Sequence, residues 1–117
     1  MRILTLATTA LLILAAATAA HAHAFLDHAE PRVGSTTPTA PKEVVLSFTQ
    51  NLEPAFSSVE VSDANGTRVD LGKPKISAST MRIGVKPLPP GTYRVRWQVL
   101  SVDTHTTEGN FTFQVGQ

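Results

Sequence analysis

Apolar residues at every second position of the segment 93–99 constrain the fold more than any other feature of this chain. The apolar positions are Tyr93, Val95, Trp97 and Val99, and the polar ones between them are Arg94, Arg96 and Gln98. Successive side chains of a β-strand point to opposite faces, so this alternation predicts a strand with one buried and one solvated face. Such strands belong to antiparallel sheets that cover a core on one side.

The same period of two recurs along the chain, and no stretch shows the spacing of an amphipathic helix. The other alternating sets are Val44, Leu46 and Phe48; Val59 and Val61; Val69 and Leu71; Met81, Ile83 and Val85; and Phe111, Phe113 and Val115. With an extended segment at 25–30, they predict about seven strands separated by turns. The expected fold class is all-β, as a Greek-key sandwich or barrel. Asp63-Ala64-Asn65-Gly66 predicts a hairpin that pairs the strands at 59–61 and 69–71, because Asn-Gly adopts positive φ at little cost.

Residues 1–22 are predicted to be a secretory signal peptide. Arg2 supplies a positive start, an uncharged and mostly apolar run follows to Ala19, and Ala20-His21-Ala22 places small residues at the cleavage site. A retained membrane anchor is the alternative, but the run is short for a span and rich in Ala and Thr. We therefore expect residues 23–117 to form one periplasmic domain with no membrane insertion after cleavage.

Charge and cysteine content exclude several classes of partner. The chain has 10 Lys and Arg against 9 Asp and Glu, and removal of Arg2 with the signal peptide leaves the two balanced. No basic field therefore favours nucleic acid or an anionic membrane surface. The absence of cysteine excludes disulfides and thiolate metal ligands, so stability must come from the apolar core.

Cleavage after Ala22 would make His23 the first residue of the exported chain. Such a histidine offers its α-amino nitrogen and its ring nitrogen to one metal ion, and Cu(II) prefers nitrogen and oxygen donors in a tetragonal arrangement. Asp103 and His105 are two apart, and on an extended backbone they would point to the same side. The other interpretation is that Asp103 lies in a turn and His105 is an ordinary loop histidine. Cleavage after Ala20 would leave a local peptide site at His23, and cleavage after Ala24 would remove that ligand.

The chain as a whole resembles the CopC family of periplasmic copper-resistance proteins, including its PcoC relatives. The segments that carry the resemblance are His23-Ala24-Phe25-Leu26 with Pro31, Phe48-Thr49-Gln50-Asn51-Leu52, Pro90-Gly91-Thr92-Tyr93 with Trp97, Ser101-Val102-Asp103-Thr104-His105, and Gly109-Asn110-Phe111-Thr112-Phe113. The resemblance implies an immunoglobulin-like Greek-key β-sandwich that takes part in copper handling beside a CopD-type inner-membrane protein. It also implies one Cu(II) ion per chain, with His23, Asp103 and His105 as the metal ligands.

Two departures from the family refine this expectation. Some relatives have Glu where this chain has Gln50, so a further carboxylate contact is absent or replaced by an amide. Others carry a methionine-rich loop for Cu(I), whereas Met81 is the only methionine after residue 22 and its alternation places it in the core. We therefore expect a Cu(II) site without a separate Cu(I) site. His28 either assists that site or is an exposed strand histidine, and Tyr93 and Trp97 are expected in the core.

The expected function is buffering, sequestration or delivery of copper by a monomeric binding protein, not an enzyme. Hydrolase chemistry is disfavoured because there is no Ser-His-Asp order, no His-Glu-x-x-His run and no Gly-rich phosphate loop. The alternative function is a copper-dependent oxidoreductase with a histidine-brace-like site. A metal-free structural or adhesion sandwich is the third possibility.

Overall fold

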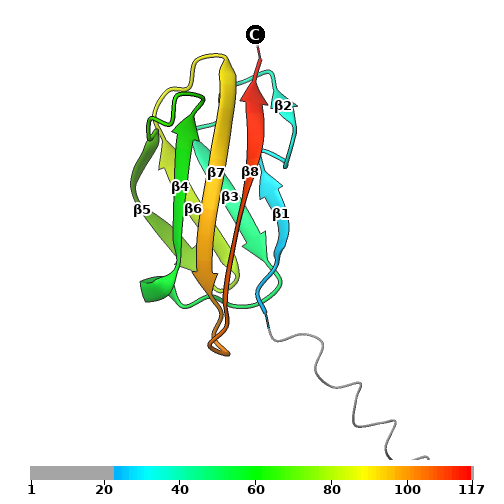
Figure 1. Ribbon diagram of the computed structural model, residues 1–117, viewed down its shortest axis with the longest axis vertical. Helices are drawn as coiled ribbons and strands as arrows, with labels where there is room; N and C mark the ends of the chain where they lie inside the picture. The colour runs from blue at the N-terminus through cyan, green and yellow to red at the C-terminus, as the bar shows by residue number, and fades with distance from the viewer. Residues whose placement is uncertain (1–22, 117) are drawn as a thin grey trace, which may run out of the picture.

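The computed structural model describes residues 23–116, which form two packed β-sheets (Figure 1). Sheet A contains β1 (Leu26–Glu30), β3 (Glu43–Phe48), β6 (Thr80–Val85) and β5 (Asp70–Ser77), in that spatial order. Sheet B contains β2 (Thr36–Thr37), β8 (Thr106–Val115), β7 (Gly91–Leu100) and β4 (Ser58–Asp63), again in that order. Neighbouring strands are antiparallel except for β2, which runs parallel to β8.

This strand order confirms the expected all-β, immunoglobulin-like sandwich. Sheet A corresponds to strands A, B, E and D of that fold, and β4, β7 and β8 correspond to C, F and G. Eight strands are present in the described residues instead of about seven. The extra strand is β2. β1 ends at Glu30, before Pro31, which has no amide hydrogen to donate, and the chain then adds β2 to the opposite sheet.

The core lies between the sheets and consists of the inward residues that the alternation indicated. Met81 is fully buried, and Tyr93 and Trp97 are also buried, as expected. The Tyr93 hydroxyl donates a hydrogen bond of 2.5 Å to the carbonyl of Pro89, which is the tyrosine corner of immunoglobulin-like domains. The Trp97 ring packs edge-on against Phe48 with 5.1 Å between ring centroids, which joins the two sheets.

The prediction of a hairpin between the strands at 59–61 and 69–71 is correct for the turn and wrong for the strand pairing. The turn itself forms, with Gly66 N donating to Asp63 O at 3.0 Å, and Val69 N then donates to Val61 O at 2.8 Å. The next bond goes from Val61 N to a side chain, the Asp70 carboxylate, at 2.9 Å. The backbone ladder therefore stops there, and β5 crosses to pair with β6 in sheet A. Leu71, expected inside, is 51% exposed as a result.

The predicted signal peptide, residues 1–22, lies outside the described residues. Between residues 23 and 116 no helix is long and apolar enough to cross a membrane, and the helical structure in this part is the 3₁₀ turn η2 (Pro54–Phe56). The chain enters β1 at the end of the sandwich where β7 turns into β8 (Figure 1). His23 and the segment 101–105 are thus brought to the same end.

Gly109 is the position where packing leaves no room for a side chain. It pairs with Trp97 across β7 and β8, and a Cβ there would lie 2.6 Å from Cζ2 of the Trp97 ring. We expect Gly109→Ala to lower the free energy of unfolding by about 1–3 kcal/mol, because the buried ring must shift. Urea unfolding followed by tryptophan fluorescence measures this change.

The matched control is Gly84→Ala, also in a strand. Its added Cβ would meet only Leu71 Cβ at 3.9 Å, an ordinary contact, so stability should stay the same or rise slightly. Equal stability changes in the two variants would contradict the packing argument.

Candidate metal centre

The loop between β7 and β8 positions Asp103 and His105. Ser101 N donates to His105 O at 3.0 Å and Thr104 N donates to Ser101 O at 2.9 Å, which closes a three-residue hairpin loop over residues 102–104. Thr104 has a φ of 71°, the left-handed conformation that ends loops of this kind. Threonine rarely adopts it, so the surrounding hydrogen bonds hold the backbone there.

This geometry corrects the expectation of an extended backbone at Asp103 and His105. The other interpretation, which placed Asp103 in a turn and His105 in a loop, describes the backbone correctly. The turn nevertheless brings the two side chains together, with 3.7 Å between Oδ1 of Asp103 and Nδ1 of His105. Both remain partly accessible, at 40% for Asp103 and 46% for His105, as ligands for an incoming ion must be.

Ser101 holds this loop through hydrogen bonds made by its buried side chain. Its side chain is fully buried, its hydroxyl donates to the Asp103 carboxylate, and the same oxygen lies 3.3 Å from the amide nitrogen of His105, which donates to it. The hydrogen bond from Ser101 holds the pKa of the Asp103 carboxyl below its usual value, and the nearby His105 ring lowers that pKa further. The carboxylate therefore stays ionised, as a metal ligand must.

The segment 23–25 brings His23 to the same place. Ala24 is fully buried in the core, and its carbonyl accepts a 2.6 Å hydrogen bond from Thr107 of β8. Phe25 exchanges two bonds with Thr49, one from its amide to the hydroxyl at 2.9 Å and one from the Thr49 amide to its carbonyl at 2.9 Å. These contacts fix the backbone next to His23.

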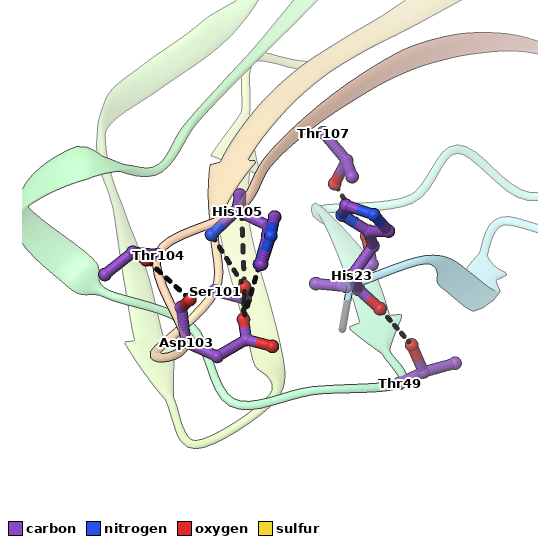
Figure 2. Close-up of polar contacts among 8 residues, drawn as sticks. His23, Thr49, Ser101, Asp103, Thr104, His105 and Thr107 are labelled. Atoms are coloured by element: carbon purple, nitrogen blue, oxygen red, sulfur yellow. Dashed lines mark hydrogen bonds and ion pairs between the residues drawn. The ribbon is translucent and has the colours of Figure 1, made fainter. Parts of the chain in front are cut away.

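The rings of His23 and His105 are in contact. Their centroids are 4.5 Å apart at an interplanar angle of 80°, and Figure 2 shows the His105 ring between Asp103 and His23. Thus the structure brings together all three residues that the sequence proposed as ligands, from the two ends of the domain sequence.

The three side chains supply two imidazoles and a carboxylate, donors that suit Cu(II). Among residues 23–116, however, no group of three or more His, Asp or Glu side chains is arranged to hold a metal ion as it stands. The two rings pack edge to face, so that one ring lies against the face of the other. Rotation of the side chains on their fixed backbones is what ion binding would require.

His28 does not join this group. It lies on β1 opposite Ser47 of β3, on the outer face of sheet A, and its Nδ1 lies 3.0 Å from Oδ2 of Asp27. Both side chains are about two-thirds exposed, at 67% and 64%. His28 is therefore an exposed strand histidine, the second of the two expectations for it. Gln50 is half-buried near this end of the sandwich.

The alternation did not single out Ser101, Thr107 or Thr49. The sequence does indicate that Ser101 and Thr107 point inward. Position 101 is two residues after the inward positions 93–99, and position 107 lies an even number of residues before the inward positions 111–115. A hydroxyl in an otherwise apolar inward row must find a partner. Thr49 follows the end of β3 and carries no comparable signal.

The fold and the site together define an immunoglobulin-like sandwich with a histidine and carboxylate cluster at one end. Comparison with known proteins gives the family: the model described as the CopC domain matches residues 26–116. Copper resistance protein C from Xanthomonas campestris pv. juglandis is 34% identical, over 94% of each chain. Protein YobA from Escherichia coli K12 is 33% identical over 80% of this chain and 79% of its own length. The chain belongs to the CopC family.

Solved structures agree with this assignment. CopC from Methylosinus trichosporium OB3b matches with a TM-score of 0.75 and 33% identity, over 80% of this chain and 94% of its own. PcoC, a methionine-rich copper resistance protein from Escherichia coli, matches with a TM-score of 0.71 and 34% identity, over 80% of this chain and 98% of its own.

The role of Ser101 can be tested in the metal-free protein. Ser101→Ala removes the largest contribution to the lowered pKa of Asp103, so that pKa should rise toward its ordinary value. A carboxyl whose pKa is lower in the folded than in the unfolded state stabilises the fold at pH values above its unfolded-state pKa. This stabilisation is lost as the pH falls through its folded-state pKa. The stability of the variant should therefore depend less on pH over that interval. Carbon-13 NMR titration of the Asp103 carboxyl gives the pKa directly.

Ser57→Ala is the control. Ser57 is also buried, but its hydroxyl contacts Glu53 O and Leu100 N instead of Asp103. An unchanged Asp103 pKa in Ser101→Ala, or an equal rise in both variants, would rule out the assigned cause.

Proposed function

We propose that this chain is a periplasmic Cu(II)-binding protein of copper resistance or homeostasis, which holds one Cu(II) ion. The ligands in this proposal are the α-amine and ring of His23, the carboxylate of Asp103 and the ring of His105. The observation that carries it is the contact between the His23 and His105 rings, 4.5 Å apart, with Asp103 beside His105. The membership of the chain in the CopC family supports copper as the metal of this cluster.

The relatives support copper as the ligand. Copper resistance protein C of Xanthomonas campestris pv. juglandis is a relative over nearly the whole chain. Copper transport protein CutJ of Bacillus subtilis is 32% identical over 82% of this chain but only 18% of its own length. A stretch like this domain thus forms part of a longer copper transport protein, which supports a copper transport protein as the partner here. In our proposal this partner is a CopD-type inner-membrane protein, and the chain acts as a monomer.

The donor set favours Cu(II) over Cu(I). Cu(I) prefers soft thioether and thiolate ligands, and the chain has no cysteine. Met81, the one methionine after residue 22, is fully buried in the core. The domain is therefore a single-site Cu(II) binder, unlike a methionine-rich protein with a second site.

The proposed site depends on export. The α-amine of His23 becomes free only when the signal peptide, residues 1–22, is removed, and removal occurs during transport to the periplasm. The amine, two imidazoles and a carboxylate would supply the four nitrogen and oxygen donors that Cu(II) prefers in a tetragonal arrangement. A fourth protein donor would favour storage and delivery of the ion over the activation of oxygen that an oxidoreductase needs, so the proposed role is not enzymatic.

Cu(II) titration of the exported protein, with its first residue confirmed by mass spectrometry, tests the proposal. We expect one tight site with a tetragonal electron paramagnetic resonance spectrum. Asp103→Ala and His105→Ala should each weaken it by more than about a hundredfold, since loss of a ligand exceeds the roughly 10–100-fold cost of losing a ligand's outer partner. Both residues lie in a loop outside the core, so circular dichroism should show an intact fold.

His28→Ala is the matched control, because it removes an exposed imidazole that lies on the outer face of sheet A. Its copper affinity should equal that of the wild type. A second control carries one glycine before His23 and should lose the chelate ring. Product formation from polysaccharides with reductant and oxygen would overturn the binding role in favour of an oxidoreductase.

A further inference from the structure

Two threonine hydroxyls hold the backbone of residues 23–25 from opposite sheets. Thr107, on β8 of sheet B, donates to Ala24 O at 2.6 Å. Thr49, directly after β3 of sheet A, accepts from Phe25 N at 2.9 Å and lies 3.4 Å from His23 O. Figure 2 shows His23 with Thr107 on one side and Thr49 on the other.

We propose that Thr107, with Thr49 as its counterpart, is a positioning residue that fixes the chelating amine of His23 against His105. The inference rests on the proposed function. It assigns a role in copper affinity to residues that are not ligands.

The reason lies in how an α-amine is placed. A ring nitrogen is moved by side-chain rotation, but the amine nitrogen is attached to Cα, so only the backbone sets its position. First residues of a chain are ordinarily poorly ordered. Here the Thr49 hydroxyl lies 3.4 Å from the His23 carbonyl. The next residue, Ala24, is completely buried, and its carbonyl is held by the Thr107 hydroxyl. The Cα atom that carries the amine is therefore held in place before the ion arrives, which lowers the ordering cost of binding.

The Thr107 hydroxyl has a specific task in this arrangement. Ala24 is fully buried and its carbonyl meets Thr107, which is itself half-buried. A buried carbonyl needs a hydrogen-bond donor, and the hydroxyl supplies it across 83 positions of sequence. Without that donor the segment would gain by turning the carbonyl toward water, and His23 would move with it.

The test uses the exported, processed protein and its form with one extra glycine before His23. In the processed form, Thr107→Val should weaken Cu(II) binding roughly tenfold, within the range for outer partners of metal ligands. In the extended form the amine chelate is already lost, so the same substitution should have no further effect. Affinities are measured by competition with a chelator in both backgrounds. Thr107→Ser, which keeps the hydroxyl, should restore wild-type affinity.

Thr106→Val is the matched control, since Thr106 is the exposed neighbour on the same strand. It should leave affinity unchanged in both backgrounds. If Thr107→Val fails to fold by circular dichroism, Thr49→Val carries the test, because Thr49 is exposed and its hydroxyl holds the same segment.

Equal weakening in the processed and extended forms would overturn the inference, because the hydroxyl would then act on the fold or on the loop of Asp103 and His105. No weakening in the processed form would overturn it as well. A wild-type protein that binds no Cu(II) would overturn the proposed function itself and this inference with it. Loss confined to the processed form supports the positioning role.

Discussion

The continuous antiparallel ladder between β7 and β8 supports both the core and the site. It runs from the pair Gly91 and Val115 to the pair Leu100 and Thr106 without a break in register. The inward side chains of these two strands supply much of the core. The loop that joins the strands carries Asp103 and His105. A slip of one residue would turn every inward side chain outward. The register that buries the core therefore also places the site.

Without disulfides, this sandwich must gain its stability from close packing. The ring of Trp97 lies over Gly109, where even one added carbon would collide with it, and it also packs against Phe48 of the opposite sheet. The hydrogen bond of the tyrosine corner, from Tyr93 to the Pro89 carbonyl, holds the segment that leads into β7. The edge amide of Val61 is satisfied by Asp70, whose carboxylate also binds Arg68 at 2.7 Å. Side chains thus complete hydrogen bonding where the backbone ladder ends.

The strands could be predicted from the sequence because burial on one face imposes a period of two. Periodicity alone could not predict which strands pair, since the hairpin signal at Asp63–Gly66 describes only a turn; the sandwich topology was expected from the family resemblance. Where the chain crosses to sheet A, the Asp70 carboxylate accepts a hydrogen bond from the Val61 amide, a contact between side chain and backbone that periodicity does not encode. The residues of the site were predicted from donor chemistry and family resemblance. Their supporting hydroxyls at Ser101, Thr107 and Thr49 depend on contacts across the folded chain.

Ala24 connects folding with maturation. Because this fully buried residue directly follows His23, only His23 precedes the core in the proposed exported chain. Neither an uncleaved precursor nor a chain cut two residues early lacks any part of the sandwich, so both would fold and pass as native by any measure of secondary structure. Under the proposed function, the precursor has no free amine at His23, and the chain cut early would instead carry a local peptide site at its new end. On that proposal, cleavage at the correct bond would be required for copper binding, although a fold measurement would not detect an error in it.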